Sequence, residues 1–143
     1  MKKYLLIFLV YCFSLTVISC GTKDNTSDNT STESSTYSDN GTTFTVTVNS
    51  SKYYIDGILT KSLNLKKGYT YYFDSTDSTT NNHPLFIGTT SSGGSYTYEY
   101  TSGVTNSRTT NGTLTIVVPS DSPSTLYYNC GNHVSMGGTI TIN

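Results

Sequence analysis

The feature of this chain that most constrains its fold is a succession of short segments in which apolar and polar residues alternate. In TFTVTV, residues 43–48, alternation places Phe44, Val46 and Val48 on one side of an extended chain, as in a half-buried strand. Gly, Asn, Asp and Pro separate such segments, and no window of ten or more residues carries an apolar stripe with helical spacing. Further candidates are residues 68–74, 83–88, 95–100, 113–119, 125–130 and 138–143. Many short strands joined by turn residues predict an all-β sandwich or barrel.

Composition and turn chemistry favour the same fold class. The chain has 13 Tyr, 12 Gly and no Trp, and aromatic and β-branched side chains pack well on pleated strands. Residues 51–65 contain Asp56-Gly57, a dipeptide that supplies the positive φ angles of a tight hairpin turn. The polar run DSTDSTTNN, residues 74–82, lacks the ligand order and the glycine of a calcium-binding loop, so we interpret it as a polar turn.

The charge of the chain excludes one class of partner. Its formal net charge at pH 7 is -1, and charged residues make up 12% of the sequence. There is neither a basic stripe for a phosphate backbone nor an acidic tail for a basic partner. We therefore expect that nucleic acid is not a partner.

The first 19 residues have the order of a bacterial secretory signal. Two lysines precede an apolar run that ends near Val17, and the run is short for a membrane span. The sequence VISC at residues 17–20, followed by Gly21, resembles the lipobox of bacterial lipoproteins, in which the cysteine is acylated and becomes the first mature residue. The resemblance implies a signal peptide at 1–19, a lipid on Cys20 and a place in the cell envelope, anchored to a membrane. The alternative is an ordinary signal peptide in which Cys20 is incidental.

Residues 20–41 are dominated by Ser, Thr, Asn and Asp. Such a segment cannot bury enough apolar surface to offset the entropy lost on ordering. We expect a flexible tether that lets the folded part stand away from the membrane. A single domain of roughly a hundred residues, 42–143, is expected to follow.

The C-terminal half of the chain contains four side chains that bind soft metal ions. Cys130, His133 and Met136 lie three residues apart, and His83 lies at the start of an earlier strand candidate. The chain has 2 His and 2 Met, so both histidines and the only methionine besides the initiator belong to this set. With the other two cysteines in the signal and at the lipidation site, Cys130 has no intramolecular disulfide partner. A free thiol in an oxidising compartment is a liability unless it is buried or metal-bound.

A thiolate, two imidazoles and a thioether suit a copper ion that alternates between Cu(II) and Cu(I). Three strong ligands in a trigonal plane with a weak axial methionine form the blue-copper arrangement, whereas zinc rarely recruits methionine. Taken singly, Cys130 would be a buried core residue, His83 a hydrogen-bonded strand-end histidine and Met136 core filler. A Cys130 nucleophile activated by His133 is a further alternative, but no orienting residue accompanies the pair.

The segments around these ligands resemble the cupredoxin family, specifically small type 1 copper proteins such as plastocyanin and amicyanin. YYNCGNHVSMGGTITI, residues 127–142, matches the C-terminal ligand loop of that family with the short amicyanin-like spacing, and NNHPLFIG, residues 81–88, occupies the place of the upstream histidine. Residues 53–74 are similar to the N-terminal half, so the resemblance covers about residues 43–143. It implies a Greek-key sandwich or barrel and one copper ion. The implied ligands are His83, Cys130, His133 and Met136.

The resemblance also implies how electrons would leave the site. His133 is expected near the surface as the exit path, and Pro84 and Val134 are expected in an apolar patch for redox partners. Members usually have Asn after the upstream histidine, and its N–H donates to the cysteine sulfur; Pro84 has no N–H. Asn132 stands where several members have Pro, so its N–H is a candidate replacement. Since such hydrogen bonds tune metal sites, the redox potential does not transfer from any relative.

Three functions follow from these observations. The first is a lipid-anchored copper protein, not an enzyme, that carries single electrons between partner proteins in the envelope. The second is a lipoprotein that binds and delivers copper without a redox partner. The third is a metal-free β-sandwich for surface adhesion. The Ser/Gly-rich segment 89–112 is unlike a compact electron carrier, and we expect it to form long loops or a surface for partners.

Overall fold

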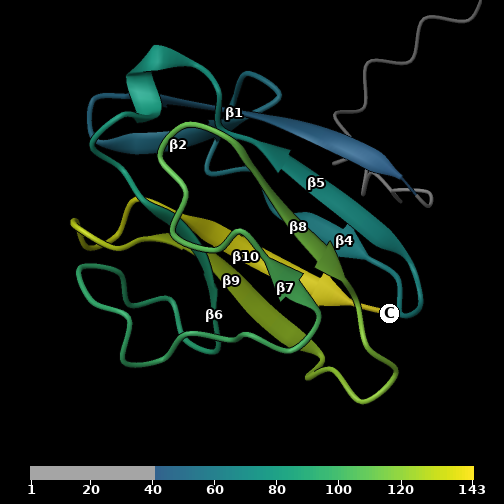
Figure 1. Ribbon diagram of the computed structural model, residues 1–143. Coiled ribbons are helices and arrows are strands. Elements are labelled where there is room, and N and C mark those ends of the chain that lie inside the picture. Colours follow the sequence, from purple (N-terminus) through teal and green to yellow (C-terminus); the bar gives the residue numbers. More distant parts are fainter. Residues whose placement is uncertain (1–40) are drawn as a thin grey trace, which may run out of the picture. The chain divides into compact units, whose positions relative to one another are not determined.

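A computed structural model describes residues 41–143, which form one two-sheet β-sandwich (Figure 1). The predicted signal peptide, Cys20 and the predicted tether up to residue 40 lie outside the described residues. Between residues 41 and 143, no helix is long and apolar enough to cross a bilayer. The prediction of an all-β sandwich is confirmed.

The larger sheet has six strands in the order β3-β2-β1-β5-β8-β7. β1 runs parallel to β5 and antiparallel to β2. The predicted turn at Asp56 and Gly57 joins β2 to β3, with φ angles of 52° and 78°. These strands are β1 (Thr42–Asn49), β2 (Lys52–Ile55), β3 (Ile58–Leu59), β5 (Thr70–Asp74), β7 (Val104–Thr105) and β8 (Thr113–Val117).

The smaller sheet has four strands in the order β4-β10-β9-β6. β10 is parallel to β4, and β9 is antiparallel to both β10 and β6. The chain passes from one sheet to the other five times, between β3 and β4, β4 and β5, β5 and β6, β6 and β7, and β8 and β9, as in a sandwich with crossing connections. These strands are β4 (Leu63–Leu65), β6 (Leu85–Gly88), β9 (Thr125–Cys130) and β10 (Gly138–Ile142).

The core lies between the two sheets, because alternate residues of the longer strands point inward. Phe44 and Val46 of β1 are buried as the alternation predicted, whereas Val48 is only partly buried. Burying a large apolar side chain contributes about 1.5–3 kcal/mol. The core therefore holds the two sheets in a defined position. It includes Tyr53, Ile55, Leu65, Tyr71, Phe73, Leu85, Ile87, Leu114, Ile116, Leu126, Tyr128, Cys130, Met136 and Ile140.

Two predictions from the sequence, a strand at residues 95–100 and a polar turn within residues 74–82, have different outcomes. The prediction of a strand at residues 95–100 is wrong: within it only Glu99 forms an isolated bridge, to Gly88. Of its alternating tyrosines, Tyr96 packs on Phe86 of β6 with ring centroids 5.2 Å apart, Tyr98 is exposed and Tyr100 packs against the core. The prediction of a polar turn within residues 74–82 is confirmed. There Asp77 caps the short 3-10 helix η1 (Ser78–Thr80).

Candidate metal centre

Strand register brings the ligand candidates together at one end of the smaller sheet. Cys130 is the last residue of β9 and pairs with Leu85, the first residue of β6. His83 lies two residues before Leu85, and His133 lies three residues after Cys130. Because a slip of one residue moves every side chain to the opposite face of a strand, the β6–β9 register decides whether His83 meets the cysteine.

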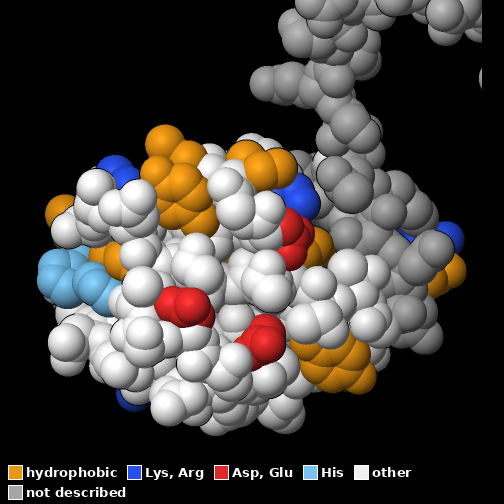
Figure 2. Space-filling view, turned by 90° about the horizontal axis from the view of Figure 1, so that it is seen from above, with side chains coloured by type: hydrophobic (Ala, Val, Ile, Leu, Met, Phe, Trp, Pro, Cys, Tyr) orange, Lys and Arg blue, Asp and Glu red, His pale blue; other side chains and the backbone are white. Residues whose placement is uncertain are grey.

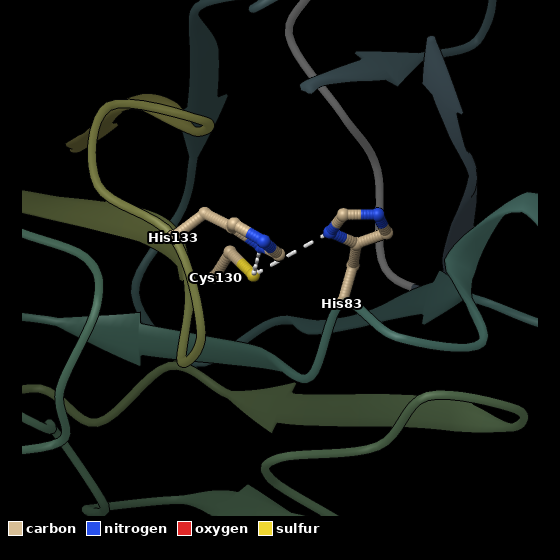
Figure 3. Close-up of side chains that lie close together, drawn as sticks. All are labelled: His83, Cys130 and His133. Atoms are coloured by element: carbon tan, nitrogen blue, oxygen red, sulfur yellow. Dashed lines mark hydrogen bonds between the residues drawn. The ribbon is translucent and has the colours of Figure 1, made fainter. Parts of the chain in front are cut away.

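The side chains of His83, Cys130 and His133 point toward one another (Figure 3). The sulfur of Cys130 lies 3.8 Å from Nδ1 of His83 and 3.6 Å from Nδ1 of His133. The candidate ligand atoms of all three residues lie within 4.8 Å of one another. The two imidazole rings are tilted by 42°, with their centroids 4.8 Å apart. A thiol and two imidazoles from two distant segments therefore point toward one small volume.

These residues fit a bound metal ion. For a trigonal centre with bonds of about 2.0 Å to nitrogen and about 2.3 Å to sulfur, a nitrogen and a sulfur ligand lie about 3.7 Å apart. The distances of 3.8 and 3.6 Å agree with that spacing. The chemistry of the donors, one soft sulfur and two imidazoles, is that of a copper site. The three residues are thus consistent with the predicted type 1 copper centre.

The centre is buried on one side and open on the other. Cys130 is buried, His83 is half-buried and His133 is exposed. Figure 2 shows the histidine side chains at the surface beside hydrophobic atoms. Burial lowers the pKa of His83 below its ordinary value, and the neighbouring His133 lowers this pKa further. Both effects favour the neutral imidazole, which is the form that binds a metal ion.

Met136 lies at the far end of the ligand loop and is buried, with 1% of its surface exposed. It belongs to the same apolar cluster as Cys130. Its backbone carbonyl accepts a hydrogen bond of 2.9 Å from the N–H of Tyr53 in β2. The methionine is therefore packed on the core side of the loop, and its role as the axial ligand stays a prediction.

Pro84 and Asn132 both hold the two ligand segments together. The carbonyl of Pro84 accepts from the N–H of Gly131 at 2.8 Å, so this residue contributes an acceptor although it has no donor. The side-chain amide of Asn132 donates to the carbonyl of Asn82 at 2.9 Å. The proposed N–H donation from Asn132 to the sulfur stays a prediction.

Two residues of β2 support the centre without any signal in the sequence. The buried hydroxyl of Tyr53 donates to the carbonyl of His83 at 2.6 Å. Burial raises the pKa of Tyr53, and the nearby Cys130 adds to the rise, so the hydroxyl stays a donor. Lys52 donates to the carbonyl of Ser135, whose φ is 57°. No pattern in the sequence indicates which carbonyl the hydroxyl of Tyr53 meets.

Comparison with known proteins finds similarity to solved structures only at low identity. No family profile and no curated protein sequence matches the chain. Among solved structures, a methionine-to-leucine variant of rusticyanin is 15% identical, with 75% of this chain and 80% of that chain covered and a TM-score of 0.48. A second rusticyanin structure, described as a copper protein, is 16% identical over 75% and 81% of the two chains, with a TM-score of 0.47.

Rusticyanin from Thiobacillus ferrooxidans gives a similar result. It is 16% identical over 75% of this chain and 80% of that chain, with a TM-score of 0.45. At these identities and scores, the assignment of the metal centre rests on the geometry of His83, Cys130 and His133 in this protein and not on the resemblance.

Proposed function

We propose that this protein is a type 1 copper protein that carries single electrons in the bacterial cell envelope, held at a membrane by a lipid on Cys20. One observation carries the proposal: the ligand atoms of His83, Cys130 and His133 lie within 4.8 Å of one another. Met136 completes the proposed ligand set as the weak axial donor. When bound, copper would supply two oxidation states, Cu(II) and Cu(I), that differ by one electron.

The residues of the chain keep the ligands in place during electron transfer. Cys130 is fixed by its pairing in the β6–β9 ladder, and Tyr53 holds the carbonyl of His83. Ligands held by strands and buried hydrogen bonds move little when the charge of the site changes. A small reorganisation permits fast electron transfer, so the scaffold suits a carrier and no substrate turnover is proposed.

The exposed side of the centre is the proposed contact with redox partners. His133 is exposed, and the neighbouring Val134 has 69% of its surface exposed. Pro84 is half-buried beside His83. An apolar patch around an exposed ligand would let a partner approach the metal closely and leave again, as a transient electron-transfer contact requires.

The decisive experiment is the visible spectrum of the purified protein after addition of Cu(II). An intense thiolate-to-copper charge-transfer band that disappears in Cys130→Ser is the expected result. Absence of the band, or a band that persists in Cys130→Ser, would rule out the blue-copper site and leave the adhesion hypothesis. Tight Cu(I) binding and hand-off without a reversible redox couple would instead favour copper delivery.

A further inference from the structure

The segment 89–112, which connects β6 to β7 and then to β8, lies against the ligand loop. The N–H of Gly94 donates to the carbonyl of Cys130 at 2.9 Å. The side-chain amide of the buried Asn129 donates to the carbonyl of Thr90, also at 2.9 Å. One hydrogen bond thus reaches the cysteine itself and another reaches the residue before it.

The 89–112 segment approaches the ligand loop so closely at Gly93 that the two backbones are in contact. A Cβ atom added to Gly93 would lie 2.7 Å from the carbonyl oxygen of Cys130 and would also collide with the carbonyl of His133. A Cβ atom added to Gly131 would collide with the hydroxyl of Tyr96. Only glycine permits so close an approach at these two positions. The glycine at position 93 therefore has a structural reason.

Tyr96 is held firmly in this contact. Its ring packs edge-on against Phe86, which lies on the outer side of β6, and the guanidinium of Arg108 lies 4.1 Å from the ring centroid on its face. Arg108 also binds Glu99 through two nitrogens, and Ser107 donates to the same carboxylate at 2.6 Å. Stacking of a guanidinium on an aromatic ring and bidentate pairing with a carboxylate together fix the orientation of the ring.

The backbone conformation of Arg108 also indicates that Tyr96 is held in a fixed orientation. Its φ is 66°, a conformation that residues with a side chain rarely adopt. The N–H of Arg108 donates to the carbonyl of Leu85 at 2.7 Å, at the start of β6. Strain of this kind persists only where surrounding contacts hold it. Here it places the guanidinium on Tyr96, next to the strand that follows His83.

We propose that the 89–112 segment is a brace that holds the Cys130–His133 loop in its ligand-binding conformation before metal arrives, with Tyr96 as its main positioning residue. Tyr96 touches the loop at Gly131, between the two ligands, and contributes no metal-binding atom. The purpose of the brace rests on the proposed copper function. The brace itself is a property of the metal-free protein and is measurable there.

The test compares Tyr96→Ala with two matched variants of the same segment in the full chain without metal. Tyr96→Phe keeps the ring, and Tyr98→Ala removes a tyrosine of which 52% is exposed. We expect hydrogen exchange of the Gly94 and Gly131 amides to accelerate about tenfold in Tyr96→Ala. Exchange should stay within about twofold of wild type in Tyr96→Phe and Tyr98→Ala. Amides in the β1–β5 and β5–β8 ladders report whether the fold is intact.

A spectroscopic readout distinguishes positioning from general stability. With Cu(II) bound, the thiolate-to-copper band should shift in energy or intensity in Tyr96→Ala and not in Tyr98→Ala. If Tyr96→Ala unfolds, Arg108→Gln loosens the ring from the exposed side and should give the same local change. Unchanged exchange at Gly94 and Gly131 would overturn the brace, as would an equal effect in Tyr98→Ala. A missing band in the wild type would refute the copper function and leave the exchange result to decide on the brace.

Discussion

The thiol sulfur of Cys130 lies 3.8 Å from Nδ1 of His83, a residue 47 positions earlier in the chain. The pairing of Leu85 with Cys130 brings them together, because it places the residues before β6 beside the end of β9. The distance thus depends on the sheet and not on the flexible reach of a loop. The β6–β9 register thus sets the position of one proposed ligand relative to another.

Replacing His83 tests whether the ligand carried by the β6 segment is required. Copper that binds only the native protein raises its apparent stability by about 2.7 kcal/mol at one hundred times the dissociation constant. His83→Ala should abolish most of this gain, while the metal-free protein loses little because the side chain is half-exposed. Thermal unfolding with and without Cu(II) measures both quantities. Asn81→Ala, at a nearby exposed position, is the control, and an equal copper effect in His83→Ala would contradict the prediction.

Replacing Met136 separates its proposed role as a ligand from its role in packing. Leucine has a similar volume, so Met136→Leu should destabilise the metal-free protein by less than about 1.5 kcal/mol. Loss of a weak donor removes electron density from the oxidised metal, and the redox potential should therefore rise. Urea unfolding and voltammetry measure the two effects. An unchanged potential would show that the thioether does not act on the metal.

Tyr53→Phe removes the hydroxyl that donates to the carbonyl of His83 at 2.6 Å. A part-buried carbonyl left without its donor should lower the free energy of unfolding by about 1–2 kcal/mol. Tyr128→Phe is the matched control, since its buried hydroxyl donates at 2.9 Å to the carbonyl of Lys61 instead. We expect similar stability losses in both variants but weaker copper binding only in Tyr53→Phe. Equal copper affinities would place Tyr53 outside the support of the centre.

The ion pair of Glu99 and Arg108 should make the stability that the brace contributes depend on pH. Hydrogen bonding from Arg108 lowers the pKa of Glu99 below its ordinary 4.5, against the opposing effect of burial and with help from Ser107. A carboxylate with a lowered pKa in the folded state stabilises fully above about pH 4.5 and loses its contribution as the pH falls through the folded pKa. The stability difference between wild type and Glu99→Gln should therefore stay constant from pH 7 to about 5 and shrink below about 4.5. Urea titrations at several pH values measure it.

Lipidation of Cys20 is testable without reference to copper. Cells fed a labelled fatty acid should incorporate the label into the protein, and Cys20→Ala should lose both the label and the association with membranes. Cys12→Ala, within the predicted signal, is the control and should retain the label. Label retained in Cys20→Ala would exclude this cysteine as the anchor.

Much of the fold follows from local patterns. Alternation over residues 43–48 and the Asp56-Gly57 signal predict strand β1 and the β2–β3 turn, because side-chain period and positive φ are properties of a few consecutive residues. The same pattern is misleading at residues 95–100. There Tyr96 packs on Phe86, Tyr98 is exposed, and pairing with β6 is limited to one isolated bridge.

The sequence by itself determined the chemistry of the centre: one cysteine, two histidines and one methionine, three of them at a spacing that a single loop can bring together. Only the tertiary structure decided that His83 meets Cys130 and His133, that Tyr53 holds its carbonyl and that Gly93 and Tyr96 pack on the ligand loop. The physical reason is that donor type is a property of a residue. Distances between residues far apart in the chain depend instead on strand register and on packing of the whole core.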